Sequence, residues 1–352
     1  MLDDWANSVD SNNSARALFV DYTKAFDRID HTLLLNKFQS YEVSNTIIKW
    51  LFSFLWQRHQ RVKIKDTYSE WILLKAGFPQ GTWLGPLAFV TLINDLSLPC
   101  SVHKFIDDTT LSETLTPSST SNMVSITEQL SQWSSRNYMV INHNKTKEIL
   151  FGSINYSNPP PPLNIDGHSV ERVNTFKLLG IYISGDFRWD AQIDALCQKV
   201  NTKLYFLKQL KRAGLSPNDL LCFYSTAIRP VLEYACVVWH HGLTKTQSDR
   251  LEALQKRAVR IIWGDIIKGM PYQLALSLCH LDSLYERRIK ISRSFFEAIC
   301  SVDSCIHHLL PPKRDQSILA RLRSASTYPI PLVKTNRYCS FVNYALLHYQ
   351  KK

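Results

Sequence analysis

The chain has 352 residues, of which 45% are hydrophobic, and it carries 41 Lys and Arg against 30 Asp and Glu. This length suits one large domain or two to three smaller ones. The net charge of +11 favours a polyanionic partner, nucleic acid above all, with an anionic membrane as the competing interpretation. No apolar run approaches the ~18 residues of a membrane span, and the N-terminus lacks a signal-peptide pattern. We therefore expect an intracellular protein of the cytoplasm or nucleus, neither secreted nor membrane-bound.

Eight cysteines are scattered through apolar helical patterns. In a long chain this distribution predicts buried, reduced thiols rather than a disulfide framework. Near the C-terminus, Cys300, Cys305, His307 and His308 are residue types that bind zinc, and the neighbouring pair Cys279–His280 could complete such a site. Because adjacent histidines rarely bind the same ion, a packed helix is the favoured alternative.

The first elements alternate between strand and helix patterns. Residues 16–21, RALFVD, predict a short buried strand that ends in Asp21. Asp30 stands where a helix N-cap belongs, before a helix over residues 31–41. Residues 44–59 predict a second helix that is apolar almost all round and therefore buried. Residues 61–78 alternate in short bursts, which predicts a hairpin.

An apolar helix over residues 84–98 follows. Residues 102–115 are apolar on both sides of Asp107 and Asp108, which predicts a hairpin with the acidic pair at its tip. A long helix over about residues 119–137 and a strand over 145–152 complete this half. The order is typical of an α+β fold in which an antiparallel sheet carries helices on one face.

The second half of the chain is mainly helical. The proline-rich tract at residues 155–164 must be extended, and two short strand patterns follow it. A helix from about residue 190 ends at Gly214, and Ser216–Pro217 begins the next one. The first of these helices has one apolar face, formed by Ile193, Leu196, Val200, Leu204 and Leu207. The tail from about residue 311 is rich in proline and basic residues.

Three aspartates suggest a chemistry for the first half. If the strand that ends at Asp21 lies beside the hairpin tipped by Asp107 and Asp108, three carboxylates meet at one sheet edge. Such a cluster needs cations, and oxygen ligands without His or Cys favour Mg²⁺ or Mn²⁺. Two such ions roughly 3.5–4 Å apart carry out nucleotidyl transfer. Spacing alone leaves open the alternative that Asp21 is a helix cap and the acidic pair an ordinary turn.

Longer motifs make the interpretation specific. LFVDYTKAFDRIDH, GFPQGTWLGPLAFVTLINDL and KFIDDTTL resemble three successive motifs of reverse transcriptases, in the form found in LINE-type non-LTR retrotransposons. WSSRNYMVINHNKTKEILFG and FKLLGIYIS are similar to the lysine motif and the primer-grip region that follow. FYSTAIRPVLEYACVVW, RLEALQKRAVRIIWG, LDSLYERRIKISRSFFEAI and HLLPPKR resemble the helical segment after the polymerase. The resemblance covers nearly the whole chain in the same order.

The resemblance implies a role for each matching residue. Asp21, Asp107 and Asp108 would bind the two ions together with the backbone carbonyl of Tyr22, and Lys145 would protonate the leaving pyrophosphate. The residues implied to bind the incoming dNTP are Phe26 as the steric gate, Gln80 and Gly81. The residues implied to hold the RNA template and DNA primer are Leu179, Gly180, Lys199, Lys203, Lys208, Lys211 and Arg212. For each residue a purely structural role, in the core, in a turn or on a solvated helix face, stays open.

The resemblance also implies a division of the chain. Residues 1–185 would form the palm, 186–265 a helical thumb-like region, and 266–352 a helical C-terminal region with the basic tail. Asp21 has only twenty residues before it, so we expect the fingers and an endonuclease to be missing. Ile106 and Trp83 are larger than the residues common at these positions. An inactive nucleic-acid-binding remnant is therefore the second hypothesis, and a helical protein-interaction scaffold the third. The oligomeric state is not predicted.

Overall fold

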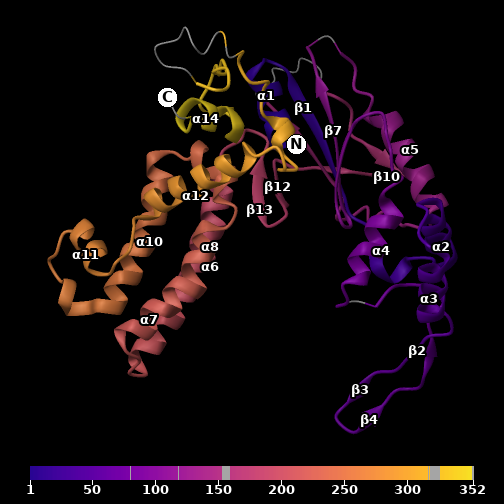
Figure 1. The fold of residues 1–352 in the computed structure, drawn as a ribbon, viewed down its shortest axis with the longest axis horizontal. Coiled ribbons are helices and arrows are strands. Elements are labelled where there is room, and N and C mark those ends of the chain that lie inside the picture. The colour runs from indigo at the N-terminus through magenta and orange to yellow at the C-terminus, as the bar shows by residue number, and fades with distance from the viewer. Residues whose placement is uncertain (80, 118, 153–158, 316, 318–325, 351–352) are drawn as a thin grey trace. The chain divides into compact units, whose positions relative to one another are not determined.

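The computed structural model describes residues 1–79, 81–117, 119–152, 159–315, 317 and 326–350 (Figure 1). These residues form two compact units. The sheet unit consists of the described residues of Ser14–Leu150 and Ile154–Asn174. The helical unit consists of those of Met1–Asn13, Phe151–Ser153 and Thr175–Lys352. The three predicted aspartates therefore all belong to the sheet unit.

A five-stranded sheet in the order β11–β8–β1–β7–β6 forms the centre of the sheet unit. Its strands are β1 (Ser14–Val20), β6 (Ser101–Phe105), β7 (Asp108–Leu115), β8 (Lys147–Phe151) and β11 (Glu171–Arg172). β7 pairs antiparallel with β1 and with β6, whereas β11 runs parallel to β8. The sheet is thus mixed, and the expectation of an antiparallel sheet is wrong for the pair of β11 and β8. β11 begins beside the first residue of β8, because Glu171 pairs with Lys147. Before it, β9 (Asn164–Ile165) and β10 (His168–Ser169) pair with each other in a separate short hairpin.

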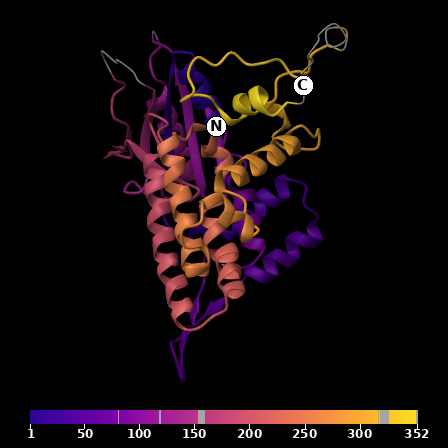
Figure 2. The same ribbon diagram turned by 90° about the vertical axis from the view of Figure 1, so that its left-hand side faces the viewer.

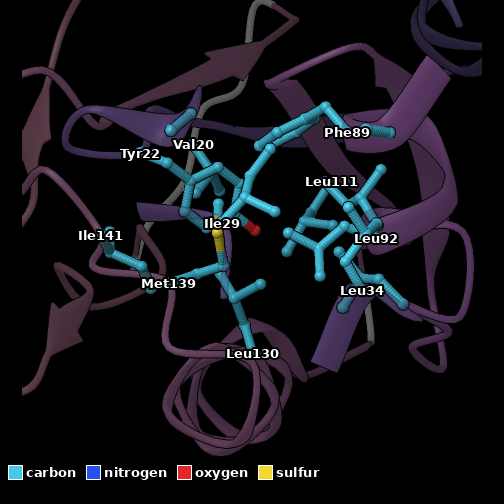
Figure 3. Packing of buried hydrophobic residues seen from close by; sticks show 14 of the residues in the cluster. Val20, Tyr22, Ile29, Leu34, Phe89, Leu92, Leu111, Leu130, Met139 and Ile141 are labelled. Carbon is cyan, nitrogen blue, oxygen red and sulfur yellow. The ribbon is translucent and has the colours of Figure 1, made fainter. Parts of the chain in front are cut away.

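Helices cover one face of this sheet. They are α2 (His31–Ser40), α3 (Asn45–Leu55), α4 (Leu84–Ile93) and α5 (Met123–Arg136), with a short 3₁₀ turn, η1 (Ala25–Arg28), after β1. Asp30 caps α2 as predicted, since its side chain accepts a hydrogen bond from Leu33 N at 2.8 Å. Figure 3 shows the core between sheet and helices, where the strand residues Val20 and Leu111 lie among Leu34, Phe89, Leu92 and Leu130 of the helices.

A buried ion pair anchors β1 to β8. Arg16 of β1 and Glu148 of β8 are both fully buried and form a charge-assisted hydrogen bond. Arg16 also donates to Ser121 Oγ and to Pro161 O, each at 2.7 Å, and Arg172 binds Glu148 from the other side at 3.2 Å. These contacts pair the buried charges and hold part of the proline-rich tract against the sheet. The sequence patterns did not predict them.

The helix α3 is more exposed than its sequence suggested. Only Leu51 and Leu55 are fully buried, whereas Trp50 and Phe52 are 58% and 45% exposed. The expectation that this helix is buried all round is therefore wrong. The apolar residues on its outer side stack on one another along the helix, with Trp50 on Phe54 and Phe52 on Trp56.

The predicted hairpin after α3 is present and extends away from the helix (Figure 1). It consists of two short antiparallel ladders, β2 (His59–Gln60) with β5 (Ile72–Leu73) and β3 (Lys63–Ile64) with β4 (Thr67–Tyr68). We call residues 57–75 the arm. All eight strand residues of the arm are exposed.

The helical unit begins with α1 (Leu2–Asp10) and the hairpin of β12 (Thr175–Leu178) and β13 (Ile181–Ser184). The long helices are α6 (Asp190–Arg212), α10 (Lys245–Trp263) and α12 (Leu284–Ile299). The shorter elements are α7 (Pro217–Phe223), a π-helix η2 (Tyr224–Ile228), α8 (Arg229–Glu233), α9 (Cys236–Trp239), η3 (His240–Gly242), η4 (Gly264–Ile267), α11 (Tyr272–Leu278), η5 (His307–Leu309) and α14 (Phe341–His348).

α6 and α10 lie side by side, and they appear as neighbouring salmon and orange helices in Figure 2. The predicted apolar face of α6 is confirmed, because its five residues are all buried. The predicted boundary is confirmed as well: Gly214 has a φ of +86°, and Ser216 caps α7 by accepting a hydrogen bond from Asp219 N at 3.2 Å. Among the described residues no single helix meets the length and hydropathy of a membrane span, and one bent pair, Pro217–Glu233 with Cys236–Gly242, does so by length and composition only.

Candidate active site

The end of the central sheet brings the three predicted aspartates together. The last pair of the β1–β7 ladder joins the residue before Asp21 to the residue after Asp108, so these two aspartates stand opposite each other. β6 and β7 are joined by a two-residue turn, Ile106–Asp107, because Phe105 pairs with Asp108. Asp107 therefore lies at the tip of the same hairpin. The predicted hairpin is confirmed, with Asp108 as the first residue of β7.

The surroundings of Asp108 disfavour the charged form of its carboxylate. Burial raises the pKa of Asp108, and the charges of Asp107 and Asp21 raise that pKa further. Oδ2 of Asp21 is buried and accepts no hydrogen bond from the described residues. This donor set suits a hard divalent cation. However, no three His, Cys, Asp or Glu side chains of the described residues are arranged to hold a metal ion. The fit thus rests on the donor chemistry and the backbone register.

Lys145 reaches the carboxylates from the loop before β8. Asn142 N donates to the Asp21 carbonyl at 2.8 Å, and Asp21 N donates to Thr146 Oγ1 at 3.3 Å, so the two segments run side by side. This pairing puts Nζ of Lys145 3.7 Å from Oδ2 of Asp21. The Lys145 side chain is 70% exposed, so solvent screens the ion pair and the amine is accessible to an anionic ligand.

The residues next to the aspartates have two notable features, a buried side chain at Tyr22 and a strained backbone at Ile106. The side chain of Tyr22 is buried in the core, where burial raises the pKa of its phenol to about 12, and its main chain bridges to Ile141. Ile106 has a φ of +57°, which is a strained conformation for a β-branched residue. The turn that presents Asp107 therefore stores backbone strain, a feature that concentrates at functional sites.

Phe26, in η1 just after β1, packs beside α4. Its ring is partly buried and lies 5.3 Å from the ring of Phe89 in α4. The chain before α4 approaches closely because Gly77 has a φ of +88°, and a Cβ there would lie only 2.9 Å from the carbonyl oxygen of Asp27. Phe26 is thus held against the core while part of its ring remains accessible.

The predicted nucleotide-contacting glycine occupies an open turn. Gly81 has a φ of +79°, and a Cβ there would meet no other atom within 4 Å. The left-handed conformation, rather than crowding, is what favours glycine at this position. Gln80 lies outside the described residues. Trp83, two residues further on, is 100% exposed.

The predicted primer-grip residues form the tip of the β12–β13 hairpin in the helical unit. Leu179 and Gly180 both have positive φ, +46° and +86°, as a tight two-residue turn requires. Tyr234 holds this tip: its hydroxyl donates to Leu179 O at 2.9 Å, and a Cβ on Gly180 would lie 3.2 Å from its ring. Nothing in the sequence indicated this contact, since Tyr234 follows a short helix far along the chain.

The basic residues predicted to contact nucleic acid lie on or near the solvent side of α6. Lys199, Lys208 and Arg212 are exposed, and Lys203 is half-buried. Lys211 is exposed too, but its Nζ donates to Ile262 O at 3.1 Å and so caps the C-terminus of α10. For Lys211 a structural role is therefore visible.

The histidines of the zinc-type cluster already have backbone partners. Nδ1 of His307 donates to Ile299 O at 2.9 Å, and Nδ1 of His308 donates to Cys305 O at 3.0 Å. Cys300 is half-buried and Cys305 exposed. The His307 hydrogen bond ties η5 to the end of α12.

Comparison with known proteins identifies the family. The family model described as reverse transcriptase (RNA-dependent DNA polymerase) matches residues 3–183, and a short match to the N-terminal part of alkylated DNA repair protein alkB homolog 8 covers residues 189–229. The probable RNA-directed DNA polymerases from transposon BS and transposon X-element of Drosophila melanogaster are 24% and 26% identical. Their matches cover 81% and 72% of this chain but only 32% and 29% of those proteins. The RNA-directed DNA polymerase from mobile element jockey of the same species is 25% identical, over 73% of this chain and 29% of that protein.

The chain therefore spans about a third of the length of these curated relatives. A solved structure of telomerase from Candida tropicalis, in complex with a fragment of telomeric RNA, aligns over 87% of this chain and 50% of that one. Its TM-score is 0.40 at 14% identity, which is too low to support any functional argument. The matches confirm the resemblance drawn from the motifs: this chain belongs to the reverse transcriptase family and is related to the polymerases of the BS, X-element and jockey non-LTR retrotransposons.

Proposed function

We propose that this chain provides the palm and thumb-like parts of an RNA-directed DNA polymerase, which adds dNMP units to a primer 3′-OH along an RNA template. The observation that carries the proposal is the register of β1 and β7, which sets Asp21 opposite Asp108 beside Asp107 and near Lys145. The family membership over residues 3–183 supports the same reaction. It would take place where RNA, primer and dNTPs meet, in the cytoplasm or nucleus.

Asp21, Asp107 and Asp108 would hold two Mg²⁺ or Mn²⁺ ions, with the Tyr22 carbonyl as a further ligand. When bound, such ions activate the primer hydroxyl and neutralise the charge of the leaving pyrophosphate. Lys145, whose amine is accessible beside Asp21, would bind the triphosphate and give a proton to the pyrophosphate. Phe26 would exclude a ribose 2′-OH, and Gln80 and Gly81 would contact the template–nucleotide pair.

The helical unit would hold the primer–template. In this proposal the hairpin tip at Leu179 and Gly180 supports the primer end, and the cations of α6 neutralise backbone phosphates without reading sequence. The residues concerned on α6 are Lys199, Lys203, Lys208, Lys211 and Arg212.

A second candidate function is nucleic-acid binding without catalysis. The observation that favours it is that Lys199, Lys208 and Arg212 of α6 are exposed and accessible to phosphates whether or not the carboxylates bind metal ions. In this case the cations of α6 would still bind primer–template, but the carboxylates would not turn over dNTPs.

Primer extension distinguishes the two candidates. The full chain is incubated with a primed RNA template, labelled dNTPs and Mg²⁺ or Mn²⁺, beside the double variant Asp107→Asn, Asp108→Asn. Asp166→Asn is the matched control, because Asp166 also lies in a hairpin turn, with a φ of +50°, outside the carboxylate cluster. We expect extension by the chain and by Asp166→Asn, and none by the double variant.

Absence of extension, with primer–template still bound in a gel-shift assay, would contradict the polymerase proposal and favour the second candidate. Absence of both activities would contradict both candidates and leave the helical scaffold, which requires neither metal nor nucleic acid.

A further inference from the structure

We propose that one face of the arm binds unpaired nucleic acid. The face consists of Arg61, Lys63, Tyr68 and Trp71, and we call it the basic–aromatic face. It adds a contact outside the carboxylate cluster to the proposed polymerase, and it does not depend on whether the chain polymerises.

The register of the hairpin gathers these four residues on one side. Lys63 lies directly opposite Tyr68 in the β3–β4 ladder. The guanidinium of Arg61 lies 3.9 Å from the centre of the Tyr68 ring and 4.6 Å from that of Trp71, and Nζ of Lys63 lies 5.2 Å from the Tyr68 ring. Cations and rings therefore alternate along a single surface.

The opposite side of the same strands differs in chemistry. Ile64 pairs with Thr67, and Gln60 pairs with Ile72, so these side chains alternate with the basic–aromatic set. Val62 extends this apolar side, and its backbone is tied to Ser69 by hydrogen bonds of 2.9 Å. The arm is thus two-sided, with cations and rings on one side and mainly aliphatic groups on the other.

Charge and exposure favour a polyanion on the basic–aromatic face. Residues 57–75 contain five Lys and Arg against two Asp and Glu. Within the described part of the chain, neither Arg61 nor Lys63 forms an ion pair. Trp71 is 60% exposed, although its ring lies beside the Arg61 guanidinium. The centres of protein interfaces are depleted in charge, so this face suits phosphates better than an apolar partner.

The rings further restrict the ligand to unpaired strands. Aromatic side chains and guanidinium planes stack on bases that are not enclosed in a duplex, and this stacking tolerates any sequence. RNA and DNA strands both offer such bases, so the shared chemistry is a phosphate backbone with about two stacked bases.

The test measures binding in the absence of catalysis. All proteins carry Asp107→Asn and Asp108→Asn, so that failure of the proposed polymerase reaction cannot affect the result. Fluorescence anisotropy follows a uridine oligomer and a thymidine oligomer of about 12 nucleotides, and a duplex of the same length. The variants are Arg61→Ala and Trp71→Ala. Their chain neighbours on the opposite side, Val62→Thr and Ile72→Thr, are the matched controls.

We expect Trp71→Ala to weaken single-strand binding by roughly tenfold or more. We expect Arg61→Ala to weaken it and to lower the slope of log K against log salt by about one. Both controls should stay within about twofold of the parent, and the duplex should not respond to Trp71→Ala. Trp71→Phe keeps a ring at this position and should retain most of the affinity, so it tests stacking even if Trp71→Ala unfolds the arm. Preference for the uridine or the thymidine oligomer then tells whether RNA or DNA is the strand held.

The proposal is overturned if both face variants bind as tightly as the controls, or if the controls lose as much affinity as the face variants. It is also overturned if the face variants leave binding intact but abolish self-association in sedimentation, which would assign the face to a protein contact.

Discussion

His240 shows at the scale of single residues how the helical unit depends on protonation. Its ring is buried and accepts a hydrogen bond at Nδ1 from Nε of Arg288, which is itself fully buried (distance 3.2 Å). Burial, and then the charge of Arg288, lower the pKa of His240 to about 3. A histidine whose folded-state pKa lies below its unfolded value stabilises the fold above the unfolded pKa, and this stability is lost as the pH falls toward the folded pKa.

We therefore predict that, when the pH falls from 7 to 5, the linkage to His240 lowers the free energy of unfolding by about 2 kcal/mol. In His240→Asn, the amide oxygen takes the place of Nδ1 as acceptor and does not titrate, so the variant should lose correspondingly less. Urea unfolding at both pH values measures the difference. His241, whose burial lowers its pKa to about 4, is present in both proteins and so cancels. Equal losses in the two proteins would contradict the prediction.

Sequence patterns could not predict which individual charged residues are buried. Arg16 and Arg288 lie in strand and helix patterns in which a charged residue normally marks the solvated side. Both are fully buried and bind partners far along the chain: Arg16 pairs with Glu148, and Arg288 donates hydrogen bonds to His240 and Ser248. Those partners become neighbours only through the tertiary fold, which periodicity does not contain.

At the scale of elements, periodicity and capping residues predicted most helices and strands. The apolar stripe of α6 and the caps at Asp30 and Ser216 are local features, so the sequence around them was sufficient. α3 was predicted wrongly because an all-round apolar pattern states how hydrophobic a helix is and not how much chain covers it. The parallel pairing of β11 with β8 likewise depends on where the chain returns, beyond the reach of any local pattern.

The β12–β13 hairpin offers a test at this scale. Gly180→Ala should lower the free energy of unfolding by about 2 kcal/mol, because alanine is strained at a φ of +86° and its Cβ would lie 3.2 Å from the Tyr234 ring. Gly167→Ala is the matched control: Gly167 has a φ of +81°, in a similar two-residue turn, with no atom within 4 Å. It should cost about 1 kcal/mol from the backbone alone.

Thermal unfolding followed by circular dichroism compares the two variants. If Gly180→Ala is no less stable than Gly167→Ala, the tyrosine does not brace the hairpin tip.

At the scale of the whole molecule, the cysteines test the expectation of reduced, buried thiols. All eight cysteines are free, but only Cys236, Cys279 and Cys339 are buried, whereas Cys222 and Cys305 are exposed. Burial raises the pKa of both Cys236 and Cys339 to about 11, which further slows their reaction as thiolates. The part of the expectation that concerned burial is therefore correct for three thiols only.

We predict that the native chain at pH 7 reacts first at Cys222 and Cys305 with a thiol reagent, and that all eight thiols react after unfolding in urea. Mass spectrometry of digested, labelled protein identifies the sites. Labelling of Cys236 or Cys339 at the rate of the exposed pair would mean that the helical unit opens readily.

For the candidate site, the sequence supplied the residue types and their order along the chain. That Asp21 stands across from Asp108 follows only from the antiparallel pairing of two strands far apart in sequence. The motif resemblance anticipated this pairing, whereas spacing alone left a capping residue and a turn as alternatives. The strain at Ile106 and the brace at Tyr234 depend on backbone angles and distant contacts, and no sequence pattern indicated either.

The position of β1 has a consequence for how the protein is made. This strand, SARALFV, is buried along its whole length, yet its two neighbours in the sheet are β7 and β8, which are translated long afterwards. At about 5–20 residues per second, the ribosome needs on the order of 5–20 s to reach the end of β7. During that interval an apolar strand with two open edges lies outside the ribosome. We therefore expect a chaperone that shields β1 during synthesis, or faster translation between β1 and β7, to improve the yield of folded protein.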